Sequence, residues 1–185
     1  MNHSIRWTLC LIIICFAMAS VAWTPWGAIY ESARDERSVG QQADDKRISL
    51  DIKGQMADRD GKKALKVHAY CFTGQVFLVG AIDDVKFRNF AIKTAKSIKG
   101  VKRVTRHFVK ETDTTSDDLK IAASVRTALI AEGDLSATQI ETETMNGEVV
   151  MVGMVRSKAD AKLAIKIAKG VDGVRKVTSY LIPPK

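Results

Sequence analysis

The stretch Gly74-Gln75-Val76-Phe77-Leu78-Val79-Gly80 decides the fold, because it recurs as Gly147-Glu148-Val149-Val150-Met151-Val152-Gly153. Working outward from this pair, an offset of 73 aligns residues 44–109 with residues 117–182 without a gap, and 17 of the 66 positions are identical. A match that keeps glycines, apolar positions and basic residues in step indicates two copies of one unit. Each copy is close to the smallest size that folds alone, so we expect the two copies to pack together.

The hydrophobic period changes in the same order within each copy. Apolar residues first recur at helical spacing, then two apolar-rich strands flank a tight turn, and a second helix and a last strand follow. The turns are Thr73-Gly74 and Asn146-Gly147, and Asn-Gly is a strong hairpin signal because both residues tolerate positive φ. This order predicts the α+β class: two tandem αββαβ domains, each a three-stranded mixed sheet with two helices packed on one face.

Polar residues mark the expected helix starts. Asp44-Asp45 and Ser116-Asp117-Asp118 supply acceptors for the free N–H groups at the first helix of each copy. Ser157, followed three residues later by Asp160, opens the second helix of the second copy. The residues expected to be buried on these helices are Ile48, Ile52, Met56, Ile121, Val125, Ala128, Leu129, Phe87, Phe90, Ala91, Thr94, Ala95 and Ile98.

Residues 1–22 have the pattern of a secretory signal peptide. Arg6 lies in a start segment without acids, an apolar run without charges follows, and small residues end the run. The run is short for a membrane-spanning helix, which needs about 20 apolar residues. A cleaved signal is the favoured interpretation. An uncleaved anchor and a lipoprotein signal stay open as alternatives, although neither Cys10 nor Cys15 follows a small residue. Each alternative exports the bulk of the chain.

The composition excludes several classes of protein. With 27% charged and 46% hydrophobic residues, the chain is neither disordered nor a polytopic membrane protein. The formal net charge of +8 points to an anionic partner. This excess lies in the first copy, because residues 44–109 hold 15 Lys and Arg against 7 Asp and Glu (+8), whereas residues 117–182 hold 9 against 9 (zero).

Few residues support catalysis. Strand alternation places Cys71 and His68 on opposite faces, so we interpret Cys71 as a small buried apolar side chain. Neither His68 nor His107 has a nucleophile at motif spacing, and no phosphate-binding loop or metal motif appears. Glu141 and Glu143 alternate along one strand, which is typical of a solvent-exposed face. The sequence therefore predicts a protein that is not an enzyme and uses no cofactor or metal.

The αββαβ order, the Gly-x-Val-x-x-x-Gly strand and the Gly-Val-x-x-Val-x ending resemble the BON domain. The leader Glu36-Arg37-Ser38-Val39-Gly40-Gln41-Gln42-Ala43-Asp44-Asp45 ahead of two such domains is similar to that of double-BON outer-membrane lipoproteins. The resemblance implies an N-terminal leader (23–43), two BON domains (44–110 and 117–183) and a linker (111–116). It also implies a non-enzymatic periplasmic protein that binds anionic phospholipid and supports outer-membrane assembly. The chain departs from these relatives because it lacks a convincing lipobox.

Two kinds of surface are candidates for the lipid contact. The second helices offer basic faces, which we expect to comprise Arg88, Ile92, Lys96 and Lys99 in the first copy and Lys158, Lys162, Lys166 and Lys169 in the second. The first helix of the second copy offers Leu119, Lys120 and Arg126, with Leu119 off the core stripe. The resemblance favours this helix, whereas the charge balance favours the first copy, and the choice stays open. An ordinary solvated helix face is the alternative for each basic stripe.

Two functions from different classes follow from these features. The first is an envelope-maintenance protein that docks on an anionic phospholipid surface, peripheral to the outer membrane or anchored if the signal is retained. Its further partner would be the outer-membrane assembly machinery, and nucleic acid is not expected as a partner of an exported chain. The second is a soluble periplasmic chaperone or interaction scaffold induced by osmotic or envelope stress. The salt dependence of binding distinguishes the two functions. Binding to lipid should weaken as salt is added, because exposed charges are screened over about 8–10 Å at ordinary ionic strength, whereas binding to unfolded clients should depend little on salt.

Overall fold

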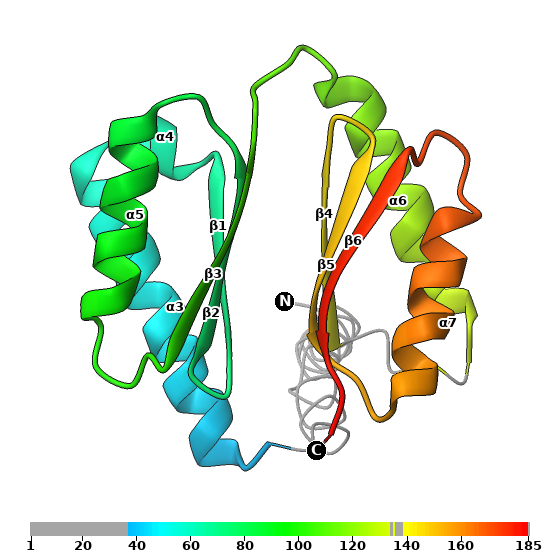
Figure 1. Ribbon diagram of the computed structural model, residues 1–185, viewed down its shortest axis with the longest axis horizontal. Helices are drawn as coiled ribbons and strands as arrows, with labels where there is room; N and C mark the ends of the chain where they lie inside the picture. Colours follow the sequence, from blue (N-terminus) through cyan, green and yellow to red (C-terminus); the bar gives the residue numbers. More distant parts are fainter. Residues whose placement is uncertain (1–36, 134, 136–138, 185) are drawn as a thin grey trace, which may run out of the picture. The chain divides into compact units, whose positions relative to one another are not determined.

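The computed structural model describes residues 37–133, 135 and 139–184 of the chain (Figure 1). The expected signal peptide and most of the leader lie outside these residues. The first repeat comprises α3 (Val39–Arg59), α4 (Gly61–Ala64), β1 (Val67–Phe72), β2 (Gln75–Ala81), α5 (Val85–Ser97) and β3 (Arg103–Val109). The second comprises α6 (Thr115–Ala131), β4 (Ile140–Met145), β5 (Glu148–Met154), α7 (Lys158–Lys169) and β6 (Lys176–Ile182). We call these repeat 1 and repeat 2.

Each repeat builds a three-stranded mixed sheet, as the sequence predicts. In repeat 1 the strand order is β1-β2-β3, with β1 antiparallel and β3 parallel to the central strand. In repeat 2 the order β4-β5-β6 has the same directions. The helices α3 and α5 cover one face of the first sheet, and α6 and α7 cover one face of the second (Figure 1). The α+β class is confirmed, and the single-turn helix α4 is an addition that the hydrophobic period did not reveal.

The glycines of the recurring stretch have a steric role. Gly74 and Gly147 occupy positive φ in the hairpin turns, at 78° and 69°, together with Thr73 and Asn146. A β-carbon on Gly80 would lie 2.1 Å from the carbonyl oxygen of Lys66, which is closer than any real contact. Gly153 meets the carbonyl oxygen of Gln139 at the same distance. The outer hairpin strand therefore starts directly against the end of the central strand in both repeats, and only glycine fits there.

Each repeat has its own helix–sheet core. In repeat 1 the expected helix residues Ile48, Ile52 and Met56 are buried against Val76 and Leu78 of the central strand. In repeat 2 the buried helix residues include Ile121, Val125, Leu129, Ala164 and Ala168. Both sets follow the 3.6-residue period, and Ala164 and Ala168 stand at the positions equivalent to Ala91 and Ala95 of repeat 1.

A third apolar cluster joins the two repeats. Phe77 and Val79 of β2 belong to it together with Val150 and Val152 of β5, and all four are almost fully buried. These residues alternate along their strands with residues that face the helices, so each sheet uses one face for its own helices and the other for the opposite repeat. The expectation that the two small units pack together is confirmed.

One helix start differs from the sequence interpretation, whereas α6 has Asp117 and Asp118 in its first turn and α7 is capped by Ser157, as expected. Helix α3 begins at Val39, several residues ahead of Asp44, and Ser38 accepts a hydrogen bond from the N–H of Gln41 at 3.2 Å as its N-cap. Helix α6 begins at Thr115, and Thr114 makes no side-chain cap. Asp45 and Asp118 do not cap their own helices, because their carboxylates reach across to the hairpin turns.

Candidate membrane-binding surface

Helix α6 exposes a line of apolar side chains away from its core. Leu119 is 67% exposed and Ile130 is 60% exposed, and Ala123 between them is exposed as well. A separation of 11 residues is close to three helical turns, so Leu119 and Ile130 lie on the same face. The placement of Leu119 off the core stripe agrees with the sequence interpretation. Ile130 was missed, although its spacing from Leu119 was a sufficient signal.

The two basic residues expected on α6 have different environments. Lys120 is exposed and lies 3.5 Å from Asp117 one turn earlier, a pairing of little energetic value at such exposure. Arg126 is half-buried, and its guanidinium donates a hydrogen bond to the carbonyl oxygen of Ile140 at 3.0 Å. Arg126 thus connects α6 to the start of β4 and does not project freely into solvent. Of the two expected basic residues, only Lys120 is exposed beside the apolar line of α6.

Helix α7 carries the basic face that the sequence predicts. Lys158, Lys162, Lys166 and Lys169 are all exposed, at spacings of four, four and three residues. Within residues 37–133, 135 and 139–184, none of these four lysines has an ion-pair partner. The helix starts at the expected cap, because Ser157 accepts a hydrogen bond from the N–H of Asp160 at 3.0 Å. Four uncompensated ammonium groups therefore follow one side of a 12-residue helix.

The basic face of α5 is composed differently from the prediction. Arg88 is half-buried: its Nε donates to the carbonyl oxygen of Ile82 at 2.6 Å, and its guanidinium lies 5.9 Å from the centre of the Phe108 ring. Ile92 is half-buried against the core of repeat 1. Both residues were wrongly placed on the free face, because α5 also packs on β3, and on this flank Arg88 reaches the Ile82 carbonyl and the Phe108 ring of β3.

The exposed face of α5 consists of the residues equivalent to the lysine row of α7. Val85, Asn89, Lys93 and Lys96 stand at the positions of Lys158, Lys162, Lys166 and Lys169, and all four are exposed. Lys86 and Lys99 are exposed beside them, so Lys96 and Lys99 lie where the sequence placed them. The match between Lys93 and Lys166 at the 73-residue offset was the signal that could have identified this face.

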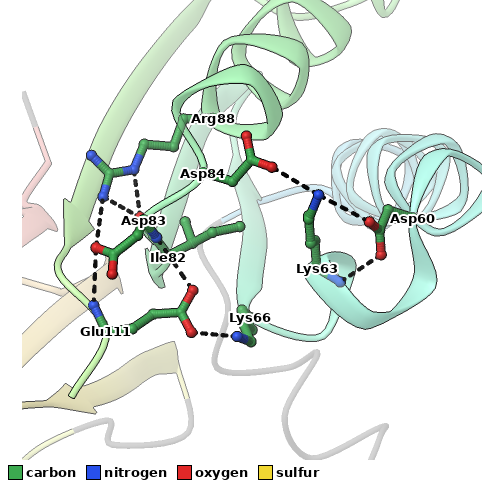
Figure 2. A network of polar contacts seen from close by, with 8 residues as sticks. All are labelled: Asp60, Lys63, Lys66, Ile82, Asp83, Asp84, Arg88 and Glu111. Carbon is green, nitrogen blue, oxygen red and sulfur yellow. Dashed lines mark hydrogen bonds and ion pairs between the residues drawn. The ribbon is translucent and has the colours of Figure 1, made fainter.

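A polar network fixes the end of repeat 1 where α5 begins (Figure 2). Lys63 of α4 lies 2.7 Å from Asp84, the N-cap of α5, and 3.2 Å from Asp60. Hydrogen bonding by Lys63 lowers the pKa of Asp84 to about 2. Lys66 pairs with Glu111, which accepts a hydrogen bond from the N–H of Asp83 at 3.3 Å.

The same end of repeat 1 presents apolar residues to solvent. Leu65, directly after α4, is 82% exposed, and Val85, the first residue of α5, is also exposed. The network in Figure 2 holds the backbone on either side of these residues, through Lys63 and Asp84. Leu65 and Val85 are therefore exposed on a part of the fold whose backbone is held by the Lys63–Asp84 ion pair.

Both histidines of the described part of the chain lie between the two repeats. His68 Nδ1 is 3.2 Å from Glu143, which also accepts a hydrogen bond from Tyr70. His107 Nε2 is 3.2 Å from Glu148. The expectation that Glu143 faces solvent is wrong, because repeat 1 covers this face of β4. The two histidines therefore serve as contacts across the repeats.

Cys71 is the free thiol of the described chain, and it is buried as expected. Burial, together with its hydrogen bond to Asp45 at 3.2 Å, raises the pKa of the thiol to about 12. A thiol with such a pKa is protonated and unreactive at neutral pH. Among the described residues, no group of three His, Cys, Asp or Glu side chains could hold a metal ion. No helix in the described part combines the length and apolar character needed to span a membrane.

The tandem αββαβ architecture, with an interface between the two sheets and basic outer helices, defines a two-domain α+β protein. The BON domain model matches residues 44–109 and 117–182, and the chain belongs to this family.

Three similar proteins extend the comparison. The chain is 27% identical over 150 residues to the outer membrane lipoprotein DolP of Haemophilus influenzae, covering 78% of this chain and 77% of DolP. It is 28% identical over 149 residues to the osmotically inducible protein Y of Escherichia coli, covering 77% and 74% of the two chains. It is 27% identical over 152 residues to a 21 kDa hemolysin of Actinobacillus pleuropneumoniae, covering 80% and 78%.

Proposed function

We propose that this protein acts in the periplasm as an envelope-maintenance protein that binds an anionic phospholipid surface and supports outer-membrane integrity. It is not an enzyme in this proposal, and its role is tied to envelope or osmotic stress. The names of two relatives, an outer membrane lipoprotein and an osmotically inducible protein, support this location and role. The secretory pattern of residues 1–22 supports export to that compartment.

The lysine row of α7 is the observation that carries the lipid-binding proposal. Its four ammonium groups are exposed and have no ion-pair partner in the described chain. Each lysine near an anionic bilayer contributes about 1 kcal/mol of attraction, so four together give useful affinity at low ionic strength. Helix α6 of the same repeat exposes Leu119 and Ile130, and in this proposal they make a separate apolar contact with the bilayer interface.

Co-sedimentation with liposomes tests the proposal directly. Residues 36–185 are the appropriate sample, because this compact unit contains all three apolar clusters and omits the apolar start of the chain. We expect binding to vesicles that contain phosphatidylglycerol, loss of that binding at high salt, and no binding to phosphatidylcholine alone. The variant K158Q/K162Q/K166Q/K169Q should bind more weakly than R103Q/R106Q/K110Q, a control that removes three exposed cations from β3 and the residue after it.

Absence of binding to either lipid would overturn the proposal. A soluble periplasmic chaperone or scaffold would then be the better account. The exposed Leu119 borders a groove of about 460 Å³, lined also by Ala122 and Met145, which could receive an apolar segment of a client. Binding of unfolded clients that is insensitive to salt would support that function.

A further inference from the structure

We infer that one molecule can bind two anionic bilayer surfaces at once, through the α5 face of repeat 1 and the α7 face of repeat 2. This inference rests on the proposed function and deepens it, because it assigns two separate docking surfaces to the same class of partner. The α5 face comprises Leu65, Val85, Lys86, Lys93, Lys96 and Lys99. The α7 face comprises Lys158, Lys162, Lys166 and Lys169.

The packing of the two sheets directs these faces away from each other. In repeat 1, Val76 and Leu78 contact the helix layer, whereas Phe77 and Val79 contact repeat 2. In repeat 2, Val149 and Met151 contact the helix layer, and Val150 and Val152 contact repeat 1. The order of layers is therefore helices, sheet, sheet, helices. A flat bilayer that touches one helix layer is separated from the other helix layer by both sheets.

Both faces have the charge that an anionic bilayer requires. Helix α5 contains Lys86, Arg88, Lys93 and Lys96 and no acidic residue. Helix α7 contains four lysines and one acid, Asp160, whose carboxylate is occupied by Arg156 Nε at 2.9 Å and by the Ser157 hydroxyl at 3.0 Å. None of Lys86, Lys93, Lys96 and Lys99 has an ion-pair partner in the described part of the chain.

The α5 face also has apolar residues to enter the bilayer interface. Leu65 and Val85 are both largely exposed at the end of the helix, where lysines surround them in the sequence at positions 62, 63, 66 and 86. On a soluble surface, large exposed apolar residues have no partner, whereas at a bilayer they contact the acyl boundary while the lysines reach the headgroups. Repeat 2 has Lys158 in place of Val85, so the α7 face is basic at this position.

The contact between the repeats buries apolar side chains of both sheets, and the two helix layers lie on the outer sides of these sheets. Phe77, Val79, Val150 and Val152 are at most 5% exposed in it. Polar contacts at its margins add to the apolar packing: Tyr70 donates to Glu143, and the Tyr180 hydroxyl lies 3.1 Å from His107 Nδ1. Because the two faces lie on opposite sides of the paired sheets, one vesicle surface does not contact both, and the second face is left to bind a second vesicle.

Vesicle clustering distinguishes two docking surfaces from one. Residues 36–185 are mixed with phosphatidylglycerol-containing vesicles, binding is followed by co-sedimentation, and clustering is followed by dynamic light scattering. We expect the unmodified protein to bind and to cluster vesicles, with clustering lost again at excess protein as every surface is filled by separate molecules. The variants K86Q/K93Q/K96Q and K158Q/K162Q/K166Q should each still bind and should each lose clustering, alone and when mixed together. The control R103Q/R106Q/K110Q should cluster as the unmodified protein does.

The outcomes separate this inference from the proposed function. Binding without clustering by the unmodified protein would overturn the two-surface inference and leave the proposed function intact. Clustering that persists in both single-face variants would also overturn it, because self-association of the protein would then be the cause. Absence of any binding would overturn the proposed function itself. Circular dichroism of each variant confirms that the fold is retained, since all substituted lysines are exposed.

Discussion

Asp45 accepts a hydrogen bond from the backbone N–H of Gly74 at 2.8 Å, across 29 residues of sequence. The same carboxylate accepts from the N–H of Thr73 at 2.7 Å. Repeat 2 reproduces the arrangement, because Asp118 accepts from Gly147 at 2.7 Å and from Asn146 at 2.8 Å. In both repeats an aspartate of the first helix thus satisfies the two donors of the hairpin turn and fixes the helix to the sheet.

Replacing Asp45 should destabilise the fold more than replacing Asp118. Asp45 is 3% exposed and also pairs with Arg37 at 2.8 Å, so its loss removes one partner of Arg37 and takes the acceptor from the N–H groups of Thr73 and Gly74. We expect Asp45→Ala to lower the free energy of unfolding by about 3 kcal/mol and Asp118→Ala by about 1–2 kcal/mol. Urea unfolding measures both. The neighbouring exposed Asp44→Ala is the control, and a loss as large as that of Asp45→Ala would contradict the argument.

Stability should fall in acid because of the same carboxylates. Burial of Asp45 raises its pKa, but hydrogen bonds from Gly74, Arg37 and Thr73 outweigh burial, so the pKa is lowered from 3.8. Burial likewise raises the pKa of Glu148, and hydrogen bonds from Thr178 and Lys176 bring it below 4.5. A group with a lowered pKa in the folded state stabilises the fold above its unfolded pKa and loses that contribution as the pH falls through its folded pKa.

The urea midpoint should therefore be constant above about pH 5.5 and decrease progressively below about pH 4.5. In Asp45→Asn the decrease should be shallower, because one of the titrating groups is gone. A midpoint that rises on acidification, or an unchanged slope in Asp45→Asn, would count against these assignments.

The sequence was sufficient to predict the structural features that depend only on residues close together along the chain. The buried positions Ile48, Ile52 and Met56, the turn at Asn146-Gly147 and the cap at Ser157 each follow from local periodicity or backbone conformation. The duplication strengthened every one of them, because each feature of one repeat could be checked in the other.

Features that depend on contacts between elements far apart in the sequence were predicted poorly. Ile92 is half-buried because it packs against the core of repeat 1, and Glu143 is covered because the two sheets pack on each other. Asp45 and Asp118 look like caps of their own helices until the position of the turn 28 and 29 residues away is known. Periodicity defines which residues share a face, but it does not tell what lies opposite that face.

Gly153, at the end of the central strand where β4 begins, should tolerate no side chain. Gly153→Ala would place a β-carbon 2.1 Å from the backbone oxygen of Gln139, at a φ of 144° that side chains disfavour. We expect a loss of at least about 2 kcal/mol in the free energy of unfolding, since backbone atoms must shift. Gly54→Ala is the matched control: Gly54 lies within α3 with nothing within 4 Å of the added carbon, so it should stabilise by about 0.5–1 kcal/mol. Equal effects of the two substitutions would contradict the argument, because the close approach of Gly153 to Gln139 would then have no cost.

The apolar line of α6 should contribute to lipid affinity without contributing to stability. Leu119 and Ile130 are more than half exposed, so Leu119→Ser and Ile130→Ser should change the free energy of unfolding by less than about 0.5 kcal/mol. If the line enters the bilayer interface, partial burial of one such side chain is worth about 1 kcal/mol, and each substitution should weaken binding to phosphatidylglycerol vesicles about fivefold. Leu50→Ser is the control, because Leu50 is exposed at the position of α3 that corresponds to Ala123 of α6. An equal effect of Leu50→Ser would mean that any exposed apolar residue suffices, and the special role of α6 would be lost.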